Sequence, residues 1–355
     1  MRHLKIVRKS VVMFAAAVIL TAAVVLVPAT SWNHAEAQGT SAPSLSTLKA
    51  KYKRPVDIPF PKNNAYTPAR ELLGRTLFFD PRLSGSNIMS CATCHNPALG
   101  WSDGLPRGLG HEMKQLGRRT PTILNLAWAE LLFWDGRAAN LEEQAAGPMQ
   151  SPAEMNGTMN EIVDKVQRVP GYRKMFEAAY PGEGVTPATI TKAIATFERT
   201  VVSAVAPFDY WIAGHENAIS DSAKRGFVLF NGKANCAVCH AGWTFTDHGF
   251  HDVGLPSADI GRGKVTPSVA TMQHAFKTPT LRNIDQRAPY MHDGSLTTLH
   301  QVVNFYQEGG VTRPSKSKLI KPLTLSATDK ADLVAFLQTL TSSDPLPAIP
   351  VLPRQ

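Results

Sequence analysis

Four cysteines occur in this 355-residue chain, and all of them fall in two copies of one pattern, Cys91-Ala-Thr-Cys94-His95 and Cys236-Ala-Val-Cys239-His240. Two thiols three residues apart can each add to one vinyl group of a single haem, and the histidine that follows then lies against the iron. This is the attachment pattern of haem c. We therefore expect two covalent haems, with His95 and His240 as the proximal ligands.

Other uses of paired cysteines explain the pattern less well. A zinc site would need four ligands from paired knuckles, and a thioredoxin-like CxxC needs neither the histidine nor a second copy. Disulfides are common in exported proteins, but here no cysteine is left over from the two motifs.

The ligand on the far side of each iron decides what each haem does, because ligand identity moves the reduction potential across about 0.8 V. Two haems in one chain suggest either a relay or a catalytic haem supplied by another. Candidates after the first motif are His111, Met113, Met149 and Met155. Candidates after the second are His248, His251, Met272, His274, Met291, His292, His300 and Tyr306. Spacing alone does not choose among them.

The elements that position these groups are expected to be helical, since strand signals are sparse. Apolar periodicity predicts helices over 187–202, from Asp221 onward, and over 327–340 with a start at Thr328 or Asp329. The halves read as a diverged repeat, in which LGRTLF before the first motif matches RGFVLF before the second. We expect a mainly α protein with two cytochrome c-like haem domains, long loops and few short strands.

The first 37 residues have the order of a secretory signal. Basic residues precede an apolar run over 11–28, and Ala35-Glu36-Ala37 then provides an A-x-A cleavage site. The interpretation is export to the periplasm. The alternative is an uncleaved membrane anchor, because the apolar run is just long enough to span a bilayer.

Composition divides the remainder of the chain. Residues 38–62 are rich in Ser, Pro and Lys and are expected to form an extended lead-in, and residues 344–355 a proline-rich tail without regular structure. Between them we place a first haem domain over 63–205 and a second over 206–343, joined at Ala206-Pro207-Phe208.

Charge and hydropathy describe a folded globular protein, with 43% hydrophobic and 18% charged residues. Loss of the leader removes four basic residues and one acidic residue, so the net charge falls from +9 to +6. The excess is scattered, without the basic block of a nucleic-acid binder. It can steer an acidic partner toward the protein.

Several longer motifs resemble the bacterial di-haem cytochrome c peroxidase and MauG superfamily across nearly the whole chain after the leader. They are CATCHNPALGWSDGLPRGLGH, RRTPTILNLAW, FWDGRAANLEEQAAGPM, PAEM, FNGKANCAVCHAGWTFTD, FKTPTLRN and APYMHDGS. The resemblance implies that the first haem reacts with peroxide and that Trp134 relays electrons between the haems. It also implies that Gln144 and Glu154 lie in the distal pocket, which Pro148 shapes.

Chemistry supports these roles. Splitting a peroxide O–O bond heterolytically requires a proton to move between its oxygens, which a carboxylate such as Glu154 can shuttle as base and then acid. Gln144 can hold peroxide or water by hydrogen bonds without titrating. An indole such as Trp134 is large, oxidisable and apolar, as a relay between haems requires.

The candidate sixth ligands of the two haem irons favour different functions. His111 matches the position that closes the first haem in the classical peroxidases, whereas MauG-type enzymes leave that iron open. At the second haem the peroxidases use a methionine fourteen residues past the His of HDG, and this count from His292 arrives at Tyr306. MauG-like members have a tyrosine there. A phenolate favours oxidised iron, whereas methionine raises the potential. We therefore expect His111 to be labile or displaced.

A further departure concerns calcium, which much of the family holds between the domains. Arg119 stands where the family has Asn, and Arg287 where it has Thr. Two cations at ~4 Å would oppose a calcium ion by several kcal/mol at intermediate dielectric. We expect no calcium, with a guanidinium in its place.

The leading hypothesis is a periplasmic di-haem oxidoreductase that reacts with hydrogen peroxide at the first haem and, like MauG, oxidises a partner protein. The alternative is a cytochrome c peroxidase that takes electrons from a small cytochrome c or a copper protein. Tyr306 favours the first and His111 the second. A non-catalytic di-haem electron carrier is a third hypothesis, but it would have no use for Glu154 and Gln144. No nucleic acid is expected as a partner, and a membrane only if the leader is retained.

Overall fold

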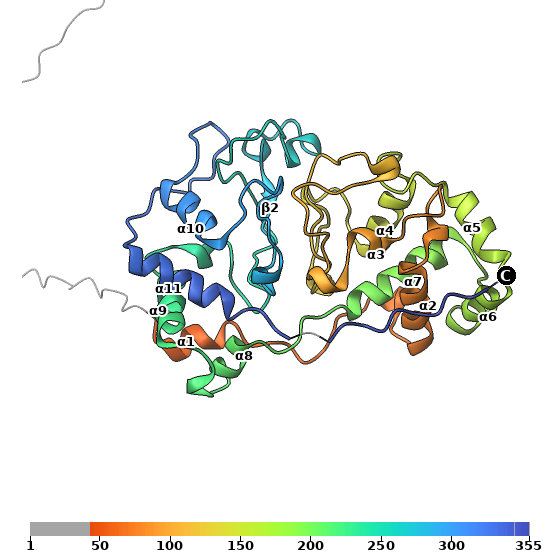
Figure 1. Cartoon of the computed structure of the whole chain (residues 1–355), viewed down its shortest axis with the longest axis horizontal. Coiled ribbons are helices and arrows are strands. Elements are labelled where there is room, and N and C mark those ends of the chain that lie inside the picture. Colours follow the sequence, from red (N-terminus) through yellow and green to blue (C-terminus); the bar gives the residue numbers. More distant parts are fainter. Residues whose placement is uncertain (1–42, 344, 355) are drawn as a thin grey trace, which may run out of the picture. The chain divides into compact units, whose positions relative to one another are not determined.

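The computed structural model describes residues 43–343 and 345–354, so the predicted leader lies outside the described residues. Helices and long loops dominate these ranges (Figure 1). The helices are α1 Leu45–Ala50, α2 Pro68–Phe78, α3 Cys91–Cys94, α4 Leu141–Gln150, α5 Met159–Gln167, α6 Pro170–Ala179, α7 Pro187–Thr200, α8 Pro207–Ile212, α9 Asp221–Asn231, α10 Leu299–Glu308 and α11 Ala327–Gln338. Strands β1 Phe250–His251 and β2 Phe276–Lys277 pair antiparallel. The expectation of a mainly α fold is confirmed.

Two hydrophobic cores form, one beside each CxxCH motif. The first is built mainly from α2, α4, α5, α6 and α7, and Cys91 packs against it. The second is built mainly from α8, α9, α10 and α11, and Cys236 packs against it. Among the described residues, no helix has the length and apolar character needed to cross a membrane.

The repeat is visible in how the helices of each core cross. In the first half α2 meets α7 at Gly74, where an added Cβ would lie 1.9 Å from the carbonyl oxygen of Ala193. In the second half α9 meets α11 at Gly226, where it would lie 2.0 Å from the carbonyl oxygen of Asp332. Both distances are too short for a side chain, so each crossing requires glycine.

Gly226→Ala is therefore expected to destabilise the protein by about 1–3 kcal/mol, because the new methyl group forces α9 away from α11. Chemical denaturation of the haem-loaded protein measures the change. Gly117→Ala is the matched control, since nothing lies within 4 Å of its added Cβ. It should change stability by no more than about 1 kcal/mol. Equal stabilities of the two variants would contradict the close crossing.

Two local predictions were wrong. The lead-in is not wholly extended, because α1 forms where the Ser44 hydroxyl accepts a hydrogen bond from the Thr47 amide. Helix α11 starts neither at Thr328 nor at Asp329. Its N-cap is Ser326, whose hydroxyl accepts from the Asp329 amide while the Asp329 carboxylate accepts from the Ser326 amide. This reciprocal capping box fixes the start.

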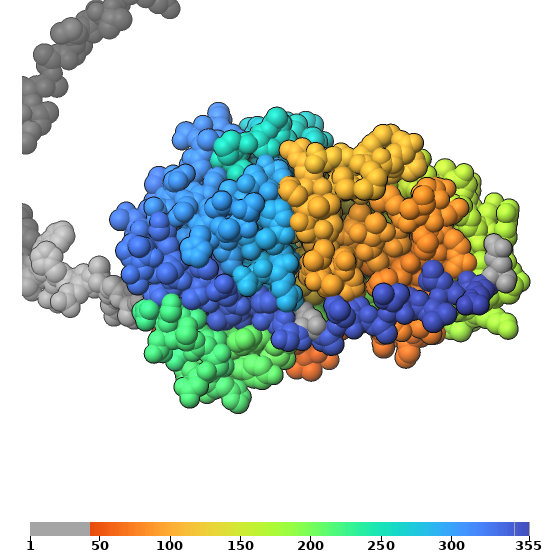
Figure 2. All heavy atoms as spheres, in the orientation of Figure 1, coloured from red at the N-terminus to blue at the C-terminus, as the bar shows by residue number. Residues whose placement is uncertain are grey.

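Both ends of the described chain pack on distant elements. Tyr52 of the lead-in is buried in the second core, and its hydroxyl donates to Asn231 Oδ1 at 2.8 Å. The described part of the tail, residues 345–354, has no helix or strand, as expected, yet it returns to the first half near α6 (Figure 1). There Arg82 Nη1 donates to the Pro353 carbonyl oxygen at 3.0 Å, and Pro353 covers Gly171. Figure 2 shows the tail, dark blue, along the surface of the first half.

Candidate active site

Both CxxCH motifs line one continuous cavity of about 830 Å³. All six motif cysteines and histidines contribute to its wall, together with residues of α4, α7 and α10. The two predicted attachment sites thus open into the same space, from opposite halves of the chain.

Each proximal histidine is held by backbone carbonyl groups. His95 Nδ1 lies 3.2 Å from the Trp101 carbonyl oxygen, and His240 Nδ1 lies 2.8 Å from that of Phe245. The backbones of two prolines, at 121 and 279, also bond to these rings. Burial lowers the pKa of both imidazoles. A neutral ring whose Nδ1–H is donated to a carbonyl keeps its Nε2 lone pair for a metal.

The sequence did not predict where the proline-threonine turns of the repeat lie. They bring the backbones of Pro121 and Pro279 close to the rings of His95 and His240. Their recurrence after each CxxCH motif was the available signal, but it does not say what the turn contacts.

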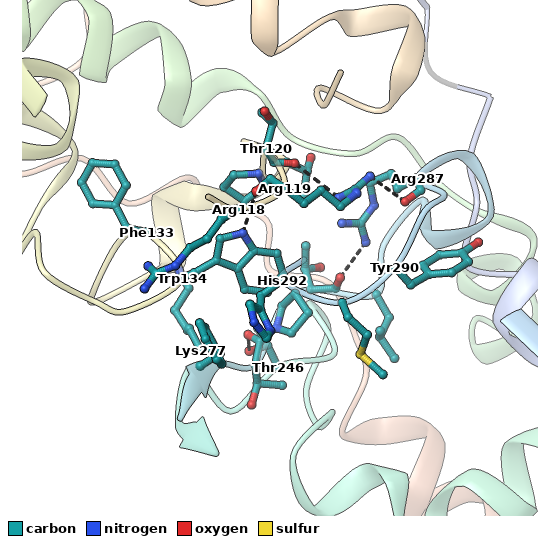
Figure 3. Close-up of a pocket in the computed structure, with 18 of the residues that line it drawn as sticks. Arg118, Arg119, Thr120, Phe133, Trp134, Thr246, Lys277, Arg287, Tyr290 and His292 are labelled. Atoms are coloured by element: carbon teal, nitrogen blue, oxygen red, sulfur yellow. Dashed lines mark hydrogen bonds between the residues drawn. The ribbon is translucent and has the colours of Figure 1, made fainter. Parts of the chain in front are cut away.

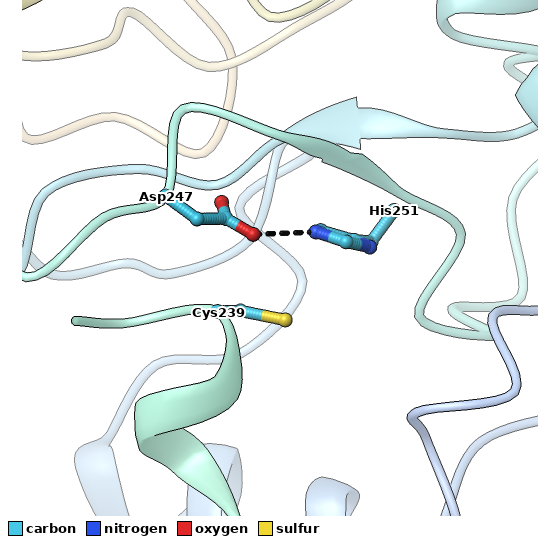
Figure 4. Close-up of side chains that lie close together, drawn as sticks. All are labelled: Cys239, Asp247 and His251. Carbon is cyan, nitrogen blue, oxygen red and sulfur yellow. Dashed lines mark hydrogen bonds and ion pairs between the residues drawn. The ribbon is translucent and has the colours of Figure 1, made fainter.

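The cysteines suit covalent attachment. Burial raises the pKa of the Cys94 thiol to about 11 and that of Cys236 to about 12, so these thiols stay protonated and are poor zinc ligands. Among the described residues one cluster could hold a metal, formed by Cys239, Asp247 and His251 (Figure 4). His251 Nε2 lies 2.8 Å from Asp247 Oδ2. A thioether bond from Cys239 to haem would take the sulfur atom of this cluster, so Cys239 would no longer serve as a ligand for another metal.

Gln144, Pro148 and Glu154 all line the cavity, as the predicted distal pocket requires. The first two lie on α4, and Glu154 follows in a loop held by hydrogen bonds from its own amide to Ser151 and from the His111 amide to Ala153. Neither the Gln144 nor the Glu154 side chain hydrogen-bonds to another described residue. Both are therefore available to a small polar molecule.

The side chain of His111 is not part of the cavity wall, and its Nε2 lies 3.8 Å from Glu112 Oε1. Its backbone nevertheless lies beside the wall, because the His111 amide donates to Ala153, the residue before Glu154. Of the other candidates in this half, Met155 lines the cavity, Met149 is fully buried in the first core and Met113 is 73% exposed. Gln144 and Glu154 thus share the cavity wall, whereas the His111 side chain is not part of it.

Trp134 is fixed from both halves of the chain. Its indole Nε1 donates to the Arg119 carbonyl oxygen at 2.8 Å, and its own carbonyl oxygen accepts from the Lys277 amide of β2 at 2.8 Å (Figure 3). Nearby, His292 stacks on Phe276 with ring centroids 3.6 Å apart. Burial lowers the pKa of His292 to about 4, so its ring is neutral.

Three cations line the cavity together with Trp134; Arg119 and Arg287 are buried, and Lys277 is partly buried. Arg119 Nη2 donates to the Arg287 carbonyl oxygen at 2.7 Å, and Arg287 Nη2 donates to the Thr280 carbonyl oxygen at 2.6 Å (Figure 3). Lys277 Nζ donates to the Leu131 carbonyl oxygen at 2.8 Å. None forms an ion pair with a described residue. Burial lowers the pKa of Arg287 to about 9 and that of Lys277 to about 8.

Such unpaired charges are costly unless an anion joins them. The propionates of a bound haem are anions of the right kind, and all three cations line the cavity. Together with the neutral proximal imidazoles and the protonated thiols, these groups fit two covalently attached haems.

Tyr306 lines the cavity near the end of α10. Burial raises the pKa of its phenol, and the Cys239 and Cys236 sulfurs raise it further. Within the described ranges the hydroxyl has no hydrogen-bond partner. Gly309, with a φ of 79°, ends the helix, so the glycine turn after Tyr306 fixes where the ring lies.

Comparisons with known proteins agree with this site. A family model described as di-haem cytochrome c peroxidase matches residues 68–217, and a cytochrome c model matches residues 223–341. The methylamine utilization protein MauG of Methylorubrum extorquens is 52% identical over 88% of this chain and 90% of its own. The cytochrome-c peroxidase IdrP1 of a Pseudomonas species is 37% identical over 81% and 85%. A crystal structure of a MauG-like protein associated with microbial copper homeostasis superposes with a TM-score of 0.76, 33% identity and coverage of 82% and 94%.

Proposed function

The chain belongs to the di-haem cytochrome c peroxidase family that includes MauG, and on this basis we propose that it oxidises a partner protein with hydrogen peroxide. Glu154 and Gln144 would act on the peroxide at the first haem, and Trp134 would connect that haem to the second. The observation that carries the proposal is Tyr306, whose unpartnered phenol lines the cavity where the family's peroxidases have a methionine.

Cys91, Cys94, Cys236 and Cys239 would hold the two haems, which supply iron that exchanges electrons with peroxide and with the partner. Glu154 takes a proton from one peroxide oxygen and returns it to the other. Gln144 orients the peroxide by hydrogen bonds. His95 and His240 stay neutral, since carbonyl groups hold their Nδ1 atoms.

Three observations favour protein oxidation over the peroxidase alternative. Tyr306 is a harder ligand than methionine. The His111 side chain does not line the cavity, which supports a first iron that is open to peroxide. Two relatives named MauG are 52% and 49% identical, against 37% for the peroxidase. In favour of a peroxidase that uses a small cytochrome c or a copper protein, the chain does contain His111.

A stopped-flow titration of the haem-loaded protein with peroxide tests the proposal. A long-lived oxidised state with near-infrared absorption supports protein oxidation. Rapid turnover with a reduced small cytochrome c, without any long-lived oxidised state, would establish the peroxidase instead. A protein that does not react with peroxide would be an electron carrier.

We also propose that the protein works in the periplasm. The support is the secretory signal order of residues 1–37, followed by two haem c motifs. The electron donor or protein substrate would then be periplasmic too.

Arg119 is proposed to replace the calcium ion that the resemblance implies for other members. Its guanidinium reaches from the first half of the chain to the Arg287 carbonyl oxygen in the second half, and its backbone carbonyl accepts from Trp134. A fixed positive charge thus joins the two halves without a metal.

Removal of calcium should therefore leave the protein unchanged. Dialysis against EGTA is expected to alter neither the haem spectra nor the rate of the peroxide reaction, because Arg119 is covalently part of the chain. Elemental analysis of the same sample should find no calcium. One tightly bound calcium per chain would refute this assignment, and Arg119→Gln should weaken the contact between the halves.

A further inference from the structure

A lysine-rich loop, residues 311–325, forms the cavity wall beside Tyr306. Leu319, Ile320 and Lys321 are among the residues that line the cavity. The loop is tied to the end of α10, because the Leu323 amide donates to the Gln307 carbonyl oxygen at 2.9 Å. Figure 1 shows this loop in blue after α10. The loop and Tyr306 therefore border the same cavity.

The loop carries an uncompensated positive charge. Residues 309–328 contain four basic residues and no acidic residue. Arg313 pairs with the buried Asp252. The side chains of the other three, Lys316, Lys318 and Lys321, form no ion pair or hydrogen bond with any described residue. Of the flanking acids, Glu308 is exposed and Asp329 pairs with Lys233 at 2.7 Å.

Lysines elsewhere on the described surface are often neutralised. Ion pairs hold Lys49, Lys114, Lys192, Lys224, Lys233 and Lys264. Other lysines, such as Lys53 and Lys174, also lack an ion pair. What distinguishes the loop is that three such lysines lie within the six residues 316–321, which contain no acidic residue.

Apolar side chains lie among these charges. Val311 and Leu319 are each 43% exposed. A small apolar centre with a charged rim is typical of protein interfaces, and rim charges govern the rate and salt dependence of encounter more than affinity. Such a surface suits a partner that must bind briefly and leave.

We propose that the lysine-rich loop is the docking surface for an acidic protein that gives electrons to the second haem site. This inference rests on the proposed function and names the chemistry of its partner. Reduction of one peroxide to two waters consumes two electrons and two protons, so the partner loses two electrons in total. The loop shortens the path for these electrons, because its inner side faces the cavity next to Tyr306.

The test uses the haem-loaded enzyme, peroxide and a reduced, acidic small cytochrome c of the c551 type as the probe. The double variant K316E/K318E is expected to lose at least tenfold in kcat/KM for the probe at low ionic strength. Added salt should slow the unmodified enzyme and speed the variant, because screening weakens attraction in one and repulsion in the other. The reaction of peroxide with the enzyme alone should not change.

The matched control is K53E/K174E, which makes the same change of charge at exposed lysines that form no ion pair with a described residue. It should keep kcat/KM within about threefold of the unmodified enzyme, as expected for charges far from a docking site. Equal losses in both variants would show attraction by net charge alone and overturn the inference, as would no loss in the loop variant. Failure of the unmodified enzyme to react with peroxide would refute the proposed function itself, and the docking inference with it.

Discussion

Tyr306→Met should raise the reduction potential of the second haem by an amount on the order of a few hundred mV, within the ~0.8 V that axial ligands cover. A phenolate is anionic and stabilises oxidised iron, whereas a thioether stabilises reduced iron. The two-electron-oxidised protein formed with peroxide should also decay faster. Spectroelectrochemistry measures the first effect and stopped-flow spectroscopy the second.

Tyr290→Phe is the matched control for this variant. Tyr290 also lines the cavity, but its hydroxyl already donates to the Ile284 carbonyl oxygen at 3.2 Å. Its replacement should leave the potential of the second haem unchanged. If Tyr306→Met also changes neither the potential nor the lifetime, Tyr306 only packs against the cavity, and the peroxidase hypothesis becomes the better one.

Glu154→Gln should slow the reaction of the protein with peroxide by about 10²–10⁴-fold, the range that a positioned acid–base group contributes. The amide has nearly the same size but cannot take a proton from one peroxide oxygen and return it to the other. The rate constant comes from single-turnover stopped-flow traces at several peroxide concentrations. The potentials of both haems should remain as in the unmodified protein.

Glu112→Gln provides the comparison, since Glu112 is a nearby exposed carboxylate whose partner is Lys114 at 2.7 Å. We expect its peroxide reaction to match that of the unmodified protein. A Glu154→Gln protein that reacts as fast as this control would mean that another group moves the proton.

The sequence predicted the larger helices because their apolar positions repeat regularly. The helix expected over 187–202 is Pro187–Thr200 in the structure, and the one expected from Asp221 starts there. Helix α1 was missed because its six residues are too few for an apolar repeat to be recognised. Tyr52, which follows α1 in the chain, packs into the second core. A pattern of neighbouring residues cannot predict such a long-range contact.

Residues at a fixed spacing from a motif could be proposed from the sequence as site residues. Contacts between residues far apart in the chain could not be predicted. Counting from His292 identified Tyr306, and the structure places that ring on the cavity wall. His111 lies in a turn in which Glu112 adopts a φ of 54°. No periodic pattern in the sequence predicts this turn. The bond from Arg119 to the Arg287 carbonyl oxygen joins residues 168 positions apart, so only the folded chain reveals it.

The packing of the two ends has a consequence for any attempt to dissect the molecule. The lead-in precedes the first half of the chain but places Tyr52 in the second core, whereas the tail follows the second half but places Pro353 on Arg82 of the first. Cleavage of the chain near residue 206 would leave each half without a segment that packs on it, because that segment would belong to the other fragment. The halves are interlocked, and each should be produced only as part of the intact chain or as two fragments allowed to reassemble.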